Sequence, residues 1–178
     1  MTSKYRLIYF NVTGLGEPIR YLFAYGNIPF EDCRLEYEEW KQYKSSTPFG
    51  QVPILEINGK AYNQTSAICR YLAKQMGLMG QTDLDCLEID GIVDTITDYR
   101  LNYAAYFKLQ TDEERDTKLK EIREIHNPYY FEKFEKIVTE NGGYFVRNKV
   151  RTLTVDNHDT DNLVGQRQQY SECPKIQC

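Results

Sequence analysis

The chain has 178 residues, of which 41% are hydrophobic and 27% are charged, and this is ordinary for a globular protein of one domain or two small ones. Its net charge of −4 argues against nucleic acid or an anionic membrane as a partner, and its apolar runs are too short to cross a bilayer. Because the five cysteines contain no Cys-x-x-Cys pair and the chain opens without a secretory leader pattern, we expect a reduced, cytoplasmic protein.

The first part of the chain alternates strand-like and helix-like segments. Residues 5–10 are aromatic and β-branched, which indicates a buried strand, and residues 29–35 indicate a second one. Between them, Pro18 suits the first turn of a helix that Gly26 ends. Two strands joined through a helix predict a parallel pair.

A hairpin and a further helix follow. Asn58-Gly59 is a favoured two-residue turn, and it separates a strand at residues 54–57 from one at residues 60–62. Gln64-Thr65-Ser66 would cap a helix that Gly77 closes. The order β-α-β followed by β-β-α predicts an α/β domain with a mixed sheet, because a hairpin pairs its strands in antiparallel fashion.

The second part of the chain has a purely helical pattern. Apolar residues recur at a helical period over residues 84–107, and a second long helix is indicated over residues 113–141, where Pro128 would kink or divide it. The last stretch is polar and without periodicity, which is typical of a disordered tail. We therefore divide the chain into a first domain, a linker, a partial all-helical domain and a divergent tail, at residues 1–78, 79–82, 83–146 and 147–178.

The stretch Gly50-Gln51-Val52-Pro53 precedes the third strand. Proline cannot donate to a sheet ladder, so Pro53 belongs at a strand's first position or in a turn. Its position would leave the backbone groups of Gln51 and Val52 outside the sheet. The stretch is therefore either a plain strand start or a clamp for an extended ligand, and a cis bond before Pro53 would hold such a clamp in a fixed pose.

Tyr9 stands late in the first strand, just before the turn-rich residues 11–16. At the carboxyl end of a strand its phenol could donate to an anion such as a thiolate and favour its formation. The other interpretation is an aromatic side chain that packs in the core, and position alone favours that one.

Two further pairs of residues suit a carboxylate. Trp40 and Lys44 are four apart, so in a helix they share one face and offer an indole N–H and a cation. Trp40 could equally be a hydrophobic anchor. Gln64 and Thr65 stand at a predicted helix N-terminus, where backbone amides and the helix dipole favour an anion. A plain helix cap is the alternative there.

Asp90, Asp94 and Asp98 form an acidic row on one face of the long helix. A solvated acidic face is the default interpretation, and a bound ammonium group or hard metal ion is the alternative. His126 and His158 have no ligand-spaced partners, so the histidines indicate no metal site.

Taken together, these residues resemble the cytosolic glutathione S-transferases, and most closely the sigma class, which includes invertebrate enzymes and the haematopoietic prostaglandin D synthase type. The resemblance covers residues 4–146. It is carried by Tyr9-Phe10-Asn11, Gly16-Glu17-Pro18-Ile19-Arg20, Pro48-Phe49-Gly50-Gln51-Val52-Pro53, Gln64-Thr65-Ser66-Ala67-Ile68 and Ile92-Val93-Asp94-Thr95.

The resemblance implies a thioredoxin-like first domain with a cis bond before Pro53, an incomplete all-α second domain, and a homodimer. It implies that Tyr9 is the catalytic residue, which donates to the glutathione sulfur and stabilises the thiolate. The residues that the resemblance places around glutathione are Tyr9, Trp40, Lys44, Gly50, Gln51, Val52, Pro53, Gln64, Thr65 and Asp98 of the partner subunit.

The activity implied by the resemblance is transfer of the glutathione thiolate to a small-molecule electrophile, with peroxidase or prostaglandin isomerase activity as further activities of the family. Glutathione is then a co-substrate, and no metal is expected. Two features depart from the family pattern. Leu15 stands where some sigma enzymes have an arginine near the thiolate, and the sequence from Val150 onward is unrelated. The alternative is therefore a truncated, catalytically impaired isoform that binds glutathione or dimerises.

Overall fold

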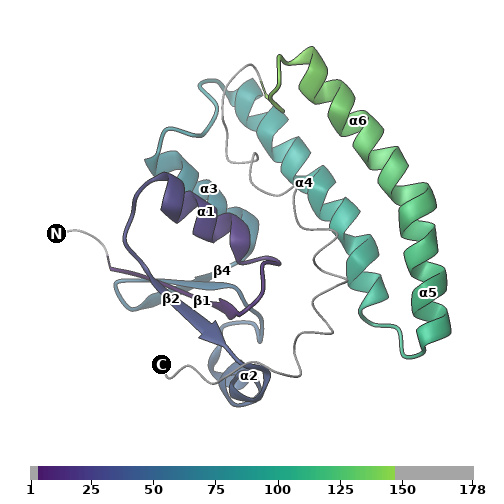
Figure 1. Ribbon diagram of the computed structural model, residues 1–178. Coiled ribbons are helices and arrows are strands. Elements are labelled where there is room, and N and C mark those ends of the chain that lie inside the picture. The colour runs from purple at the N-terminus through teal and green to yellow at the C-terminus, as the bar shows by residue number, and fades with distance from the viewer. Residues whose placement is uncertain (1–3, 147–178) are drawn as a thin grey trace. The chain divides into compact units, whose positions relative to one another are not determined.

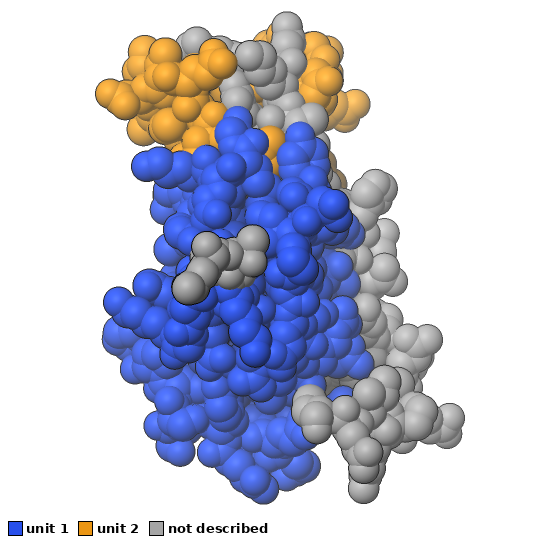
Figure 2. Space-filling model, turned by 90° about the vertical axis from the view of Figure 1, so that its left-hand side faces the viewer, with its two compact units in different colours: residues 1–77, 155–178 blue, residues 78–154 orange. Residues whose placement is uncertain are grey.

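The computed structural model describes residues 4–146 (Figure 1). Within that range the chain forms two compact units, residues 4–77 and residues 78–146, which Figure 2 colours blue and orange. The tail predicted over residues 147–178 lies outside the described residues, and the linker at residues 79–82 stays a prediction. Among the described residues, no helix has both the length and the apolar character that crossing a membrane requires.

The first unit is built on a four-stranded sheet with the order β2-β1-β3-β4. The strands are β1 (Tyr5–Phe10), β2 (Glu31–Leu35), β3 (Ile54–Ile57) and β4 (Lys60–Asn63). Strand β1 pairs with β2 in parallel and with β3 in antiparallel fashion, and β3 and β4 form the antiparallel hairpin. The predicted mixed sheet is therefore confirmed. Strand β2 begins at Glu31 rather than at Pro29 because proline has no N–H for the ladder.

Helices cover both faces of this sheet (Figure 1). Helix α1 (Glu17–Tyr25) and helix α3 (Thr65–Gln75) lie on one face, where the ring of Tyr5 contacts that of Phe23 at a centroid distance of 5.3 Å. Side chains alternate along a strand, so Tyr9 shares this face with Tyr5, while Arg6 and Ile8 point to the other. On that second face, Ile8 packs in an apolar cluster that includes Trp40 of helix α2 (Tyr37–Tyr43).

The polar segment after β2 is helical, which is the condition under which Trp40 and Lys44 share one face. Helix α2 begins with a capping box in which the Glu36 carboxylate accepts from the backbone of Glu39, and the Glu39 carboxylate accepts from the backbone of Glu36. It runs directly into a single 3₁₀ turn, η1 (Lys44–Ser46). Lys44 therefore stands at the junction of the two elements.

The second unit consists of helices, as predicted. Its elements are α4 (Asp83–Tyr106), α5 (Asp112–Glu121), the π-helical turn η2 (Ile122–His126) and α6 (Asn127–Glu140). Ile89, Ile96, Phe134 and Val146 are buried together at its core. Helix α4 buries Ile89, Ile96, Tyr99 and Tyr103, which belong to the helical period that the sequence showed.

The long helix expected over residues 113–141 is divided, and Pro128 explains where. Proline lacks the N–H for the carbonyl four residues back, and its ring clashes with that carbonyl. Here the chain passes through the wider π-helical turn just before Pro128, which sits in the first turn of α6. Glu121 accepts hydrogen bonds from Lys118 and His126 at this turn, and these bonds lower the pKa of the Glu121 carboxyl, with Lys118 contributing most.

Candidate functional site

Tyr9 lies at the end of β1 with its ring buried and its hydroxyl held by the next loop. The backbone N–H of Leu15 donates to the Tyr9 hydroxyl oxygen at 2.9 Å. The side chain as a whole is 7% exposed. The ring therefore packs in the core and its oxygen contacts the next loop, while donation from Tyr9 to a thiolate stays a prediction.

Two glycines allow the loop to wrap around this phenol. A Cβ on Gly14 would stand 2.6 Å from the Tyr9 hydroxyl oxygen, and a Cβ on Gly16 would overlap the Tyr9 ring. Gly14 also has a φ of +42°, which disfavours side chains with a Cβ. Small residues are therefore required at both positions for the Leu15 N–H to reach the phenol.

Thr65 is joined to the same loop from the other side. Its hydroxyl, in the first turn of α3, donates to the carbonyl oxygen of Leu15 at 3.2 Å. The peptide groups of Leu15 thus connect Tyr9, at the end of β1, with the N-terminus of α3. Two residues that the sequence analysis selected for separate reasons are brought to one place.

Gln64 has an unusual backbone conformation. It is the N-cap residue of α3, with φ 76° and ψ 109°, and among the described contacts its side chain makes no capping hydrogen bond. A positive φ costs free energy for a residue other than glycine, and such residues cluster at functional sites. The plain-cap interpretation therefore does not account for Gln64, whose side chain is exposed.

The stretch before β3 has the predicted cis bond between Val52 and Pro53. The ladder between β1 and β3 runs from the Tyr5–Ile57 pair to the Ile8–Ile54 pair, so Val52 stands beyond its end. Pro53 is buried and Gln51 is exposed.

Lys44 is brought beside this stretch. A Cβ on Gly50 would contact the Lys44 side chain, with Cε at 3.5 Å. Gly50 itself has a φ of +63°. The exposed Lys44 cation and the start of the predicted clamp are therefore neighbours, although they come from separate elements.

Trp40 is the hydrophobic anchor of α2. Its ring packs edge-on against Phe10 at a centroid distance of 5.7 Å, and Val52 packs against the same apolar cluster. This contact packs α2 against the sheet. Because Lys44 follows Trp40 by one helical turn, the same contact fixes the position of Lys44 beside Gly50. An interaction of the Trp40 indole with a carboxylate stays a prediction.

The acidic row lies on α4 in the second unit. Asp94 and Asp98 are exposed, and Asp90 is half-buried. Within residues 4–146, the structure shows no cluster of three or more His, Cys, Asp or Glu side chains that could hold a metal ion.

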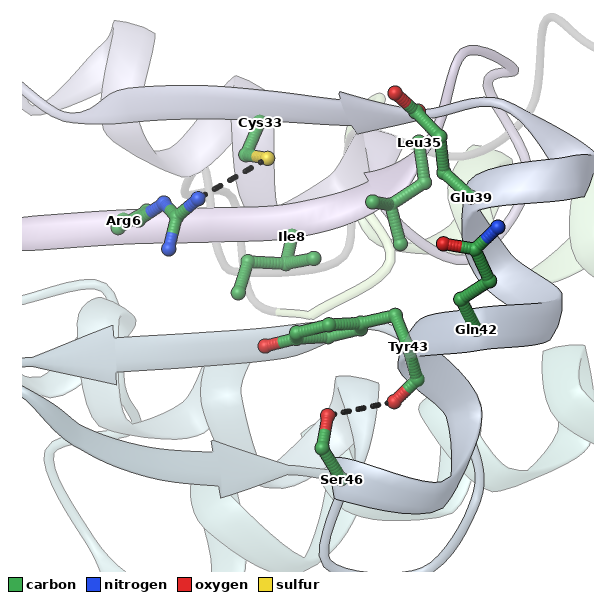
Figure 3. Close-up of a pocket in the computed structure, with 8 residues that line it drawn as sticks. All are labelled: Arg6, Ile8, Cys33, Leu35, Glu39, Gln42, Tyr43 and Ser46. Atoms are coloured by element: carbon green, nitrogen blue, oxygen red, sulfur yellow. Dashed lines mark hydrogen bonds between the residues drawn. The ribbon is translucent and has the colours of Figure 1, made fainter.

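A cavity of about 380 Å³ lies on the other face of the sheet, between α2 and the strands (Figure 3). Arg6 donates to the Cys33 sulfur at 3.4 Å at one end of it. Tyr43 also lines the cavity, and its pKa is raised by burial and then by the charge of Glu56. The full lining is Arg6, Ile8, Cys33, Leu35, Glu39, Gln42, Tyr43 and Ser46. None of these residues belongs to the predicted glutathione set, so the cavity is separate from that site.

Sequence reasoning assigned no role to Leu15 or Arg20 in the arrangement around Tyr9. Leu15 acts through its peptide groups, which leave no signal in residue type. Arg20 is buried to 7% exposure although it is charged, and its guanidinium carbon is 5.9 Å from the centroid of the Tyr9 ring. The sequence did offer one signal for Arg20, because it is a charged residue on the apolar face of the first predicted helix.

A thioredoxin-like mixed sheet followed by a helical unit defines the class of the fold, and comparison with known proteins gives the family. Residues 5–74 match the glutathione S-transferase N-terminal domain, and residues 97–153 match the glutathione S-transferase C-terminal domain. A glutathione S-transferase of Anopheles gambiae is 43% identical over 145 residues, which are 82% of this chain and 71% of that protein.

Solved structures agree with this assignment. The prostaglandin synthase D of Nilaparvata lugens superposes with a TM-score of 0.82 at 41% identity, over 84% of this chain and 75% of that one. A glutathione S-transferase of the hookworm Necator americanus, described as monomeric, gives 0.76 at 29% identity over the same shares. The chain belongs to the glutathione S-transferase family, a family of enzymes that use glutathione as co-substrate.

Replacing Gly16 tests whether the loop must stay close to Tyr9. We expect Gly16→Ala to lower the free energy of unfolding by about 1–3 kcal/mol, because the added methyl group would overlap the Tyr9 ring. Gly91→Ala is the matched control, since a Cβ there meets nothing within 4 Å and alanine favours the interior of α4 by about 1 kcal/mol. Urea unfolding measures both, and a Gly16→Ala protein as stable as the parent would contradict the close approach.

Proposed function

We propose that residues 1–78 bind glutathione, that Tyr9 stabilises its thiolate, and that the chain transfers this thiolate to a small electrophile. The observation that carries the proposal is the connection of Tyr9 to Thr65 through Leu15. It places a phenol oxygen and a helix N-terminus on the two sides of one loop. Glutathione carries a thiol and a terminal carboxylate, so a site that binds it needs the phenol for the thiol and the helix N-terminus for the carboxylate.

Tyr9 supplies the chemistry in this proposal. A free thiol titrates near about 8.5, so only a small share is thiolate at neutral pH. A hydrogen bond donated to the sulfur favours the charged form and lowers the pKa of the thiol. The thiolate is the nucleophile, so this single hydrogen bond raises the concentration of the reactive species without any change to the electrophile.

The remaining residues hold the tripeptide at three places. Lys44 and the indole of Trp40 bind the glycyl carboxylate. The backbone of Gln51 and Val52, beside Gly50 and the cis Pro53, pairs with the cysteinyl part. Gln64 and Thr65 bind the γ-glutamyl carboxylate at the N-terminus of α3, and three facts support these roles: Lys44 adjoins Gly50, Val52 stands beyond the ladder, and Gln64 has a positive φ. A helix N-terminus favours an anion through its exposed N–H groups and dipole.

The class within the family, a second activity and the cellular compartment are also part of the proposal. Likeness to the Nilaparvata lugens prostaglandin synthase D supports the sigma class and a prostaglandin isomerase activity beside conjugation. The five cysteines of the sequence contain no Cys-x-x-Cys pair, which supports a reducing compartment such as the cytoplasm. A form that binds glutathione without turnover is the second candidate, and it motivates separate measurement of binding and turnover.

Replacing Tyr9 separates thiolate formation from binding. We expect Tyr9→Phe to lower kcat/KM for conjugation of glutathione to an aryl halide by on the order of 10²-fold, because one donor to a developing anion is lost. The dissociation constant of glutathione should change much less. Tyr25→Phe, at an exposed position on α1, is the matched control. Equal rates for Tyr9→Phe and the parent would remove the role of Tyr9, and glutathione binding without turnover in the parent would favour the second candidate.

Replacing Lys44 tests the carboxylate contact. Lys44→Gln should raise the dissociation constant of glutathione about tenfold and leave kcat nearly unchanged, because a charge-assisted bond to the ground state is lost. Lys41→Gln removes an equal charge from the same segment, where Lys41 pairs with Glu38. Calorimetry should show no change for this control. If both variants weaken binding equally, the effect is one of general charge and Lys44 has no specific contact.

The proposal includes a homodimer in which Asp98 of the partner subunit binds the γ-glutamyl ammonium group. The exposed carboxylate of Asp98 on α4 supports this role. Sedimentation should give twice the mass of 21.0 kDa, and Asp98→Asn should weaken glutathione binding while Asp94→Asn does not. A monomer with full affinity for glutathione would exclude the shared site.

A further inference from the structure

Arg20 occupies an unusual place for a charged residue. It lies on the buried face of α1, and its side chain is 8% exposed. Burying a charge is costly unless it is paired and hydrogen-bonded. Arg20 meets that condition through two carboxylates, because its Nη1 donates to Glu17 at 2.8 Å and its Nε donates to Asp32 at 3.1 Å.

The same guanidinium holds the backbone on both sides of the end of β1. Its Nη2 donates to the carbonyl oxygen of Phe10 at 3.2 Å, and its Nη1 donates to the carbonyl oxygen of Val12 at 2.9 Å. These carbonyls stand at the start of the loop whose Leu15 N–H reaches the Tyr9 oxygen. One planar group with five N–H donors therefore fixes the strand end, the loop and the first turn of α1.

The guanidinium also lies near the Tyr9 ring. Its central carbon is 5.9 Å from the ring centroid, within the range of a cation–π contact. The charged groups around it are Glu17 on α1 and Asp32 on β2, and Arg34 pairs with the second of these at 2.8 Å. The two carboxylates and two guanidinium groups balance in charge, and Arg20 is the member of this set with a contact to the ring.

We propose that Arg20 is a positioning residue for Tyr9, which holds the Leu15 N–H on the phenol oxygen and keeps a cation beside the ring. This inference rests on the proposed function and deepens it. A phenol oxygen that accepts from an N–H is a stronger donor through its own O–H, because hydrogen bonds in a chain polarise one another. A nearby cation favours negative charge on the phenol in the same direction. Both effects strengthen the hydrogen bond that Tyr9 donates to the thiolate.

The test compares two arginines that share Asp32. Arg20→Gln removes the cation and the clamp, whereas Arg34→Gln removes the exposed partner of the same carboxylate and a hydrogen bond to the Asn11 side chain, but no contact to the Tyr9 ring or to the Phe10 and Val12 carbonyls. The full chain with bound glutathione is titrated, and the ultraviolet absorbance of the thiolate is followed against pH. Circular dichroism and urea unfolding check that each protein is folded. Arg20→Lys keeps the charge but has too few donors to reach both carbonyls and both carboxylates.

The expected results differ between the variants. Arg20→Gln should raise the midpoint of thiolate formation by about one pH unit and lower kcat at neutral pH about tenfold, with the glutathione dissociation constant within about threefold. Arg20→Lys should fall between this variant and the parent, and Arg34→Gln should match the parent. A role in stability alone would lower the urea midpoint and leave the thiolate midpoint unmoved.

Specific outcomes overturn the proposal. A folded Arg20→Gln protein with the parent's thiolate midpoint excludes the positioning role, and so does an equal shift in Arg34→Gln. If Arg20→Gln does not fold, a parental midpoint in Arg20→Lys excludes the role in the same way. Failure of the proposed function is distinguishable, because it appears as an unsubstituted protein that forms no glutathione thiolate.

Discussion

The site in the first unit depends on one peptide segment that is held from both sides. The N–H of Leu15 donates to Tyr9, and the carbonyl oxygen of Leu15 accepts from Thr65. Neither contact is strong by itself, since a single hydrogen bond contributes about 1 kcal/mol net. Together they fix the loop between β1 and α1 against the start of α3. Because the phenol is buried up to its hydroxyl, the position of that oxygen is set by the packing of the sheet and not by a mobile side chain.

The part of the site that is proposed to bind the glycyl carboxylate depends on hydrophobic packing instead. Trp40 seats α2 against Phe10 and the cluster around Ile8, and Lys44 follows one turn later beside Gly50. The sequence offered Trp40 as either an anchor or a ligand contact. The structure shows the anchoring contact, which makes the placement of the Lys44 cation a consequence of burying the Trp40 ring. Apolar burial therefore decides where a charged group is presented.

Local signals in the sequence predicted the fold well because each has a direct steric cause. Asn58-Gly59 gave the hairpin, Pro53 marked the start of β3, and Pro128 divided the last long helix, whereas the cis bond before Pro53 was expected from the resemblance. The contacts of Leu15 and Arg20 could not be predicted in the same way, since most of them use backbone groups and one joins Leu15 to the distant Thr65. The positive φ of Gln64 has no signature in residue type either. Family resemblance selected the site residues, and geometry supplied the reasons that hold them in place.

These relations separate two properties of the enzyme. The described contacts that position Tyr9, Thr65, Lys44 and Gly50 lie within residues 4–77, so the proposed thiolate formation depends on the sheet and its own helices. The second unit has a core of its own around Ile89 and Phe134, and it keeps Leu84, Leu87, Leu101 and Ile125 exposed. In the proposed function, apolar surface accepts the electrophile, whereas a few hydrogen bonds activate glutathione. In the proposed function, a change in the helical unit away from Asp98 would therefore alter which electrophile reacts while the thiolate forms as before, provided that the loop at Leu15 keeps its two contacts.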